Sequence, residues 1–165
     1  MLKGINKLLT GDLLKILCDM GHGDELIIAD ANFPAEALAA RLIRLPGIDG
    51  VRAAEAVLSI FPLDTYSIPA FIMDLTDSDK AKGMPEPDIW PEYEKLTGGT
   101  EKLERYEFYE RAKKAYCIIQ TGEERQYANL LLVKGVVLAD DAQSDPTKKK
   151  SSGGITRGAD YYRKS

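Results

Sequence analysis

The chain has few of the residues that build metal and disulfide sites, with one histidine and two cysteines in 165 residues. A Cys/His metal cluster needs three or four such ligands close together, and a site made of carboxylates alone would show no diagnostic spacing in this chain. We therefore expect no metal. Cys18 and Cys117 lie far apart in apolar stretches, which predicts two buried thiols in a reducing compartment rather than a disulfide.

A large excess of charge of one sign is also missing, since the chain has 22 Lys and Arg and 26 Asp and Glu, which gives a net charge of −4. This balance offers no electrostatic basis for binding nucleic acid or an anionic membrane surface, and we expect neither as a partner. No apolar run approaches the roughly 18 residues of a membrane span, and the first residues do not resemble a secretory signal. The expectation is a cytoplasmic protein that acts on a neutral substrate.

The usual nucleotide and nucleophile motifs are absent as well. Gly21-His22-Gly23 begins like a dinucleotide-binding loop, but the third glycine is missing and the segment precedes its predicted strand. Neither a Walker loop nor a Gly-x-Ser-x-Gly elbow occurs. A nucleophilic Cys18–His22 pair would require an exposed thiol where the helical pattern predicts the core face. We expect no cofactor.

The single histidine, His22, is the residue best suited to proton transfer. Its unperturbed side chain exchanges protons near neutral pH, and the flanking Gly21 and Gly23 can take φ > 0 and let a ligand approach closely. The alternative is that Gly21 only ends the preceding helix and that His22 follows by accident. The local residues leave both interpretations open.

Alternating apolar patterns predict an α/β fold. We expect helices at 12–20, from 35 toward 41, at 50–61, just after 91 and at 106–115, and strands at 25–29, 70–73, 116–121 and 129–133. A polar loop fills 76–88, with Trp90 as its anchor. The 44% hydrophobic content is enough for one core, so residues 1–139 are predicted to form one domain. Residues 140–165 have few aliphatic side chains and are expected to be a disordered tail.

Several segments together point to a family. They are MGHGDELIIADANFPAEA around His22, PLDTY at 62–66, YEFYERAKKA at 106–115 and TGEERQYANLLLVKG at 121–135. Over nearly all of residues 1–138 the chain resembles the ribose pyranase/fucose mutarotase family. The resemblance implies a single-domain, three-layer α/β fold and a homo-oligomer, often a ring of ten subunits in bacterial members. It also implies cofactor-free exchange of the anomers of L-fucose.

The same resemblance assigns the site residues. It places the catalytic histidine on His22. The sugar-binding residues fall on Asp30, Arg105, Tyr127, Ala128 and Asn129. Ala128 stands where the family has glycine, and if the backbone there needs φ > 0 the alanine would cost about 1 kcal/mol.

This chemistry requires few groups. Mutarotation removes a proton from the anomeric hydroxyl and delivers one to the ring oxygen, and His22 can act as acid in one direction and base in the other. Phe33 or Tyr127 could cover the C5 methyl group of fucose. Two other interpretations stay open, a ribose pyranase-type aldose isomerase and a non-catalytic monosaccharide-binding protein.

The predicted strand at 25–29 creates a difficulty for a site within one chain. In an extended strand, at about 3.3 Å per residue, His22 and Asp30 lie toward opposite ends, where one sugar cannot easily touch both. Either the segment from Gly21 to Asp24 folds back or a neighbouring subunit supplies part of each site.

Overall fold

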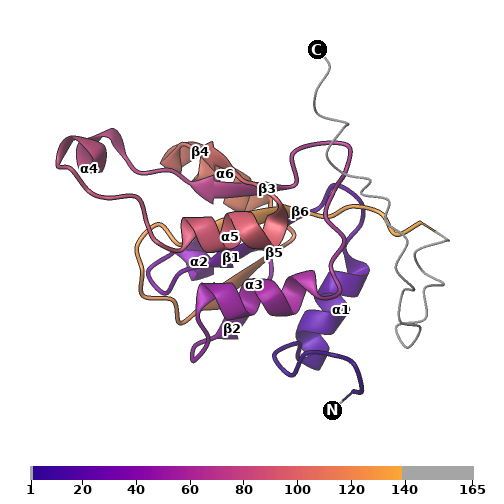
Figure 1. Ribbon diagram of the computed structural model, residues 1–165. Coiled ribbons are helices and arrows are strands. Elements are labelled where there is room, and N and C mark those ends of the chain that lie inside the picture. The colour runs from indigo at the N-terminus through magenta and orange to yellow at the C-terminus, as the bar shows by residue number, and fades with distance from the viewer. Residues whose placement is uncertain (1, 139–165) are drawn as a thin grey trace, which may run out of the picture.

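The computed structural model describes residues 2–138, and the predicted tail at 140–165 lies outside them (Figure 1). The helices are α1 (Gly11–Asp19), α2 (Ala35–Leu38), α3 (Gly50–Leu58), α4 (Asp77–Ala81), α5 (Trp90–Thr97) and α6 (Arg105–Lys114). The strands are β1 (Glu25–Ala29), β2 (Leu42–Leu45), β3 (Ala70–Met73), β4 (Glu101–Leu103), β5 (Cys117–Thr121) and β6 (Leu130–Val133). The predicted α/β fold is confirmed.

The strands form one mixed sheet of six strands in the order β2-β5-β1-β6-β3-β4. β1 pairs in parallel with β5, while β6 runs antiparallel to both of its neighbours, β1 and β3. The strands predicted at 25–29 and 70–73 have the observed bounds. β2 and β4 were not predicted, because they lie at the sheet edges and keep exposed polar residues that break the apolar pattern.

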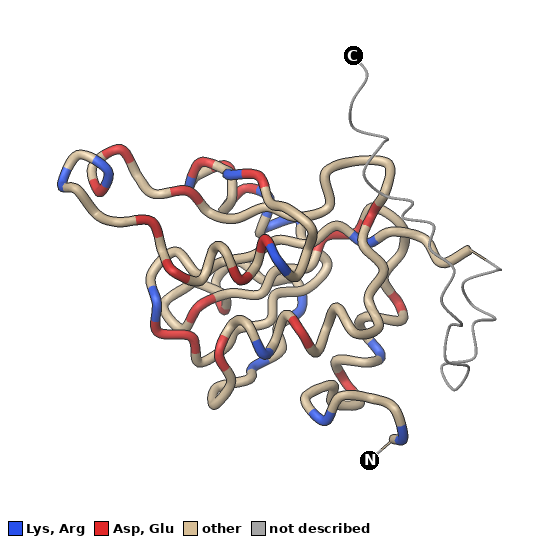
Figure 2. The backbone as a smooth tube through the Cα atoms, in the orientation of Figure 1, with Lys and Arg blue, Asp and Glu red and all other residues tan. Residues whose placement is uncertain are grey.

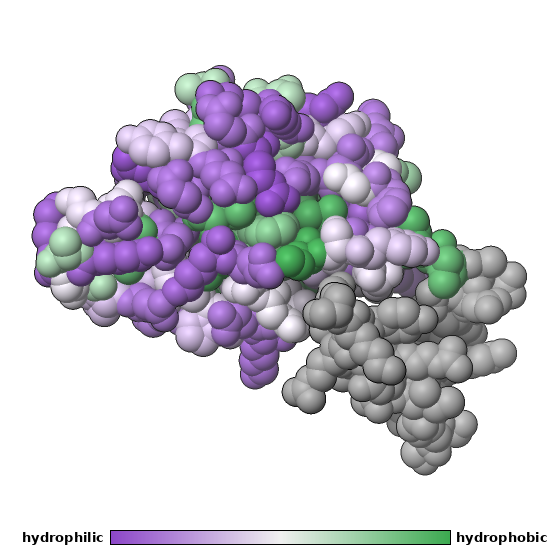
Figure 3. Space-filling view, turned by 90° about the horizontal axis from the view of Figure 1, so that it is seen from above, coloured by the Kyte–Doolittle hydropathy of each residue, from purple (hydrophilic) through white to green (hydrophobic). Residues whose placement is uncertain are grey.

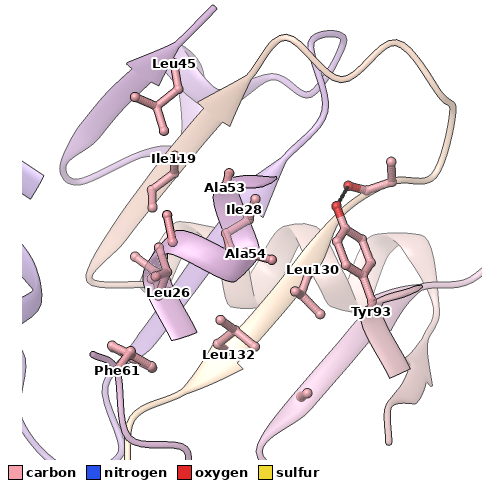
Figure 4. Close-up of a cluster of buried hydrophobic side chains, with 14 of the residues drawn as sticks. Leu26, Ile28, Leu45, Ala53, Ala54, Phe61, Tyr93, Ile119, Leu130 and Leu132 are labelled. Carbon is pink, nitrogen blue, oxygen red and sulfur yellow. Dashed lines mark hydrogen bonds between the residues drawn. The ribbon is translucent and has the colours of Figure 1, made fainter. Parts of the chain in front are cut away.

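Both faces of the sheet are covered, so the molecule has three layers. On one face, Ile28 and Leu130 pack in a cluster with side chains from α1, α3 and α5. Figure 4 shows the part of this cluster that includes Ala53 of α3 and Tyr93 of α5. On the other face, Ile27 and Leu131 pack with Phe108 of α6 and with α2. Alternate residues of each strand point to opposite faces, so the central strands are apolar throughout. This arrangement confirms the predicted three-layer fold.

Glycine is required where α3 packs against α5. A Cβ atom at Gly50 would lie 2.1 Å from the Tyr93 hydroxyl oxygen, a distance that no side chain tolerates. The Tyr93 hydroxyl in turn donates to the Ala128 carbonyl oxygen at 3.1 Å (Figure 4). This hydrogen bond links the contact between α3 and α5 to the backbone just before β6.

The two cysteines differ in their surroundings. Cys117 is buried as predicted, and burial raises the pKa of its thiol to about 11. Cys18 is exposed, so the prediction of a buried thiol was wrong there. Leu13 and Leu17 form the buried face of α1, and the residue after Leu17 is rotated about 100° away from that face.

Lys and Arg are interspersed with Asp and Glu along the described backbone (Figure 2). None of the helices within residues 2–138 is long and apolar enough to cross a membrane.

Glu123, a buried residue of the loop after β5, forms an ion pair within that loop and a hydrogen bond to the start of α3. The Glu123 carboxylate accepts hydrogen bonds from the Arg125 guanidinium at 2.9 and 2.8 Å and from the Gly50 amide at 3.1 Å. Its side chain is only 4% exposed. Led by the Arg125 hydrogen bonds, these contacts lower the pKa of Glu123 to about 2.

Glu123→Gln should lower the free energy of unfolding at pH 7 by about 2 kcal/mol. Because the folded pKa lies below the unfolded one, the ionised carboxylate stabilises the fold above about pH 4.5, and this contribution disappears as the pH falls toward 2. Urea unfolding of both proteins at pH 7, 5 and 3 measures the difference. The exposed neighbour Glu124 supplies the control Glu124→Gln, and a deficit that is equal at pH 7 and pH 3 would contradict the assignment.

Candidate functional site

Four segments meet at the edge of the sheet where the parallel strands end. Asp30 follows β1, Met73 ends β3, and Arg105 comes two residues after β4. Asn129 precedes β6, which runs in the opposite direction and therefore starts at this edge. Polar groups from distant parts of the chain are brought together here, as is common for ligand sites at the carboxyl ends of parallel strands.

These residues line a cavity of about 480 Å³, called here the carboxyl-edge cavity. Its volume lies within the roughly 300–1,000 Å³ of small-molecule sites. Four of the five predicted sugar-binding residues line it, namely Asp30, Arg105, Tyr127 and Asn129. The other lining residues are Asn32, Phe33, Met73, Asp79, Tyr109 and Gln126. Phe33, Met73 and Tyr109 give the cavity apolar surface beside its polar groups.

Asp30 is held in a fixed orientation. Its backbone amide donates to Asn129 Oδ1 at 2.9 Å, and Asn129 Nδ2 donates back to Asp30 Oδ2 at 2.8 Å. The Asn32 amide donates to Asp30 Oδ1 at 2.9 Å. Burial raises the pKa of the Asp30 carboxyl, and the bonds from Asn32 and Asn129 oppose that rise. The result is a preorganised acceptor at the floor of the cavity.

Arg105 brings hydrogen-bond donors to the same cavity. One of its terminal nitrogens donates to the Tyr106 hydroxyl at 3.0 Å. Its Nε atom is buried and has no hydrogen-bond partner within residues 2–138. A guanidinium has five N–H donors and no acceptor, so donors remain for a ligand that offers oxygen atoms.

The backbone before β6 places Tyr127 rather than Ala128 in the cavity. Tyr127 has φ of +58°, a left-handed conformation that is unfavourable for residues other than glycine. Ala128 has no positive φ. The strain considered for Ala128 therefore lies one residue earlier. Ala128 is fully buried and is not among the residues lining the cavity. Trp90 is buried and its Nε1 donates to the Tyr127 carbonyl at 3.0 Å, so Trp90 holds this turn, while its role as anchor of the polar loop at 76–88 stays a prediction.

His22 lies in a tight turn between α1 and β1. The Gly21 amide donates to Asp24 Oδ2 at 2.7 Å, and the Gly23 amide donates to the Lys134 carbonyl at 2.8 Å. Gly23 has φ of +84°, but Gly21 does not take a positive φ, so only one of the two glycines is used as expected. The turn presents a His22 side chain that is 47% exposed.

A carboxylate orients the imidazole ring. His22 Nε2 lies 3.1 Å from Oδ1 of Asp64. Although burial opposes ionisation, hydrogen bonds from Ser67, the Tyr66 amide and His22 lower the pKa of Asp64 to about 2. An ionised carboxylate only accepts hydrogen bonds, so Nε2 carries the proton and Nδ1 is the basic nitrogen of the neutral ring. This pairing leaves Nδ1 as the nitrogen that can accept a hydrogen bond from a ligand.

The structure does not bring His22 to the carboxyl-edge cavity of its own chain. His22 precedes β1 and Asp30 follows it, and the five residues of β1 separate the two edges by about 16 Å at 3.3 Å per residue. His22 instead lines a separate cavity of about 560 Å³ with Asp64 and Tyr66. The turn does not fold back, which removes one of the two solutions to the distance problem.

The residues of these two cavities that sequence reasoning missed include Asp64, Met73, Asp79 and Tyr109. Asp64 lies in a loop, and Asp79 lies in the segment 76–88 that the sequence predicts as a polar loop, where aspartate is ordinary. Met73 and Tyr109 read as core residues. The segments PLDTY and YEFYERAKKA contain Asp64 and Tyr109, and this resemblance is the only signal that could have singled them out.

Known proteins resemble this chain in sequence and in fold. The chain is 49% identical over 146 residues to the fucose mutarotase of Mus musculus, an alignment that covers 82% of this chain and 95% of the relative. The crystal structure of the Streptococcus pneumoniae fucose mutarotase in complex with L-fucose superposes with a TM-score of 0.77 at 40% identity, covering 83% of this chain and all of that one.

A more distant structure, Bacillus subtilis RbsD complexed with D-ribose, has a TM-score of 0.63 at 27% identity and covers 84% of this chain and all of that one. A sequence model of the RbsD / FucU transport protein family matches residues 3–137. This match spans almost all of the described residues and includes both cavities. The chain belongs to the RbsD / FucU transport protein family.

Proposed function

We propose that this protein is an L-fucose mutarotase, an isomerase that interconverts the α and β anomers by opening and reclosing the sugar ring. The observation that carries the proposal is a cavity of about 480 Å³ lined by the polar residues Asp30, Arg105 and Asn129, in a chain 39–49% identical to fucose mutarotases. The sugar hydroxyls would donate to the Asp30 carboxylate and accept from the guanidinium of Arg105, which lines the cavity and has N–H donors to spare.

His22 would supply the proton transfer. With Nε2 held by Asp64, Nδ1 accepts the proton of the anomeric hydroxyl, and the imidazolium then returns a proton to the ring oxygen. Rotation of the aldehyde about C1–C2 before reclosure gives the other anomer. No hydride, electron or group leaves the substrate, so the reaction balances with His22 alone. General acid–base catalysis contributes about 10²–10⁴-fold, which suits a reaction that already proceeds slowly in water.

We further propose that each site is shared between two copies of the chain. His22 lies at one edge of the sheet and the carboxyl-edge cavity at the other, so the histidine edge of one copy would face the cavity of the next. The self-association implied by this geometry is a homo-oligomer, with a ring of the kind known in bacterial relatives as one solution. The exposed free thiol of Cys18 supports a reducing, cytoplasmic location.

A ribose pyranase activity is the second candidate, because a solved relative binds D-ribose. The apolar lining by Phe33, Met73 and Tyr109 favours a sugar with a methyl group over ribose. A purely binding function is disfavoured by the His22–Asp64 pair, which a sugar receptor does not need.

The test is anomer exchange measured by saturation-transfer NMR on the anomeric protons of L-fucose, D-ribose and D-galactose. We expect exchange with L-fucose to be fastest. Specific activity should fall when the protein is diluted below its assembly constant, with light scattering run in parallel. Binding without exchange would support the receptor interpretation, faster exchange of D-ribose would support the pyranase, and a fully active monomer would contradict the shared site.

A further inference from the structure

A short helix outside the body of the molecule reaches the wall of the carboxyl-edge cavity. α4 projects from the three layers and has no buried residue (Figure 1), and its surface is largely hydrophilic (Figure 3). The core therefore does not need this helix. Even so, one of its side chains, Asp79, lines the cavity beside Tyr127.

Asp79 and Tyr127 are in direct contact. The Tyr127 hydroxyl oxygen lies 2.5 Å from Asp79 Oδ2. Thr76, which caps α4, donates from Oγ1 to the same carboxylate oxygen at 3.0 Å. Lys82 forms an ion pair with the other oxygen at 3.5 Å. Led by the Tyr127 bond, these contacts lower the pKa of Asp79, so the carboxylate is ionised at neutral pH.

An ionised carboxylate fixes what the phenol can do. The single hydroxyl proton of Tyr127 is donated in the hydrogen bond to Asp79, so only the lone pairs of the phenol oxygen remain as acceptors. The Thr76 amide donates to that oxygen at 3.5 Å, which leaves one acceptor position for a ligand. The backbone of Tyr127 is already constrained by its φ of +58° and by the Trp90 bond to its carbonyl. With both ends held, the ring has little freedom to turn out of the cavity.

We propose that Asp79 is a positioning residue for sugar binding, which holds the Tyr127 hydroxyl as a hydrogen-bond acceptor aimed at a substrate hydroxyl. This inference rests on the proposed function and adds α4 to the site. The helix thereby becomes part of the binding machinery, although no core residue depends on it.

The first test separates binding from catalysis. Asp79→Ala should raise the KM for L-fucose by about 10-fold and leave kcat within about 2-fold, because the lost contact serves ground state and transition state equally. Asp79→Asn keeps an acceptor but loses the charge, so its KM should rise by about 3-fold. Asp77→Asn is the matched control, since Asp77 is an exposed residue in the same first turn of α4, and both kinetic constants should stay unchanged.

A double-mutant cycle then asks whether Asp79 acts through Tyr127. In a Tyr127→Phe background, Asp79→Ala should have no further effect on KM, because the phenol that it positions is gone. Additive effects would overturn the proposal, as would an unchanged KM in Asp79→Ala or a loss confined to kcat.

A sugar-free measurement keeps this inference distinct from the proposed function. With ¹³C-labelled tyrosine, the ring signal of Tyr127, assigned by its loss in Tyr127→Phe, should shift in Asp79→Ala and not in Asp77→Asn. An unchanged signal would overturn the positioning role even in an active enzyme. Wild-type protein that fails to exchange L-fucose would instead overturn the proposed function, whatever the tyrosine signal does.

Discussion

Replacing His22 by glutamine should lower the rate of L-fucose anomer exchange by at least about 100-fold while the fold stays intact. Glutamine keeps a polar side chain that can still donate to Asp64, but it cannot take up a proton near neutral pH. His22 is half exposed in a surface turn, so its replacement removes no core packing. Anomer-exchange NMR at saturating L-fucose measures the loss, and circular dichroism checks the fold.

Cys18 provides the control for this prediction. It is exposed, and it lines a groove together with His22, so a cysteine–histidine mechanism would require it. Cys18→Ser should retain full exchange if His22 acts with Asp64 alone. Loss of exchange in well-folded Cys18→Ser would establish the nucleophilic pair, and near-normal exchange in His22→Gln would remove the histidine from the mechanism.

Two inactive variants should restore activity when they assemble together. His22→Gln has an intact carboxyl-edge cavity, and Asp30→Asn has an intact histidine edge. If each site takes one part from each of two copies, random assembly at equal amounts leaves about a quarter of the sites with both native residues. Coexpression, or unfolding and refolding of the mixture, should therefore recover about a quarter of wild-type exchange.

The matched controls are each variant refolded alone and the double variant refolded alone, none of which should recover activity. Arg105→Ala serves as a second cavity variant should the amide of Asp30→Asn disturb the bonds to Asn129. A single-chain site predicts no recovery in any mixture. Complementation thus tests the shared site whatever the number of subunits in the oligomer.

The central strands could be predicted from the sequence because their residues are buried on both faces. Ala70–Met73 is a continuous apolar run, and the observed strand has those bounds. β2 and β4 gave no such signal, because an edge strand buries one face at most and Glu101 and Lys102 are exposed. The helix predicted toward Arg41 ends at Leu38, since the next residues lead into β2.

The candidate site could be predicted only in part. Family resemblance, not periodicity, identified Asp30, Arg105, Tyr127 and Asn129, and all four line one cavity. The partner of His22 could not be predicted, because Asp64 lies 42 positions away in the sequence and only the fold brings the two residues together. The left-handed residue could not be placed either, since Ala128 occupied the family's glycine position while the strain falls on Tyr127.

The position of β6 has a consequence for how the protein is made. β6 is the last strand of the described chain, yet it lies between β1 and β3 in the middle of the sheet. During synthesis, the edges of β1 and β3 that pair with β6 have no partner until Leu130–Val133 leaves the ribosome. Such non-local pairing slows folding. Asn129 arrives with the same segment, so the sheet closes and Asp30 gains its partner in one late event.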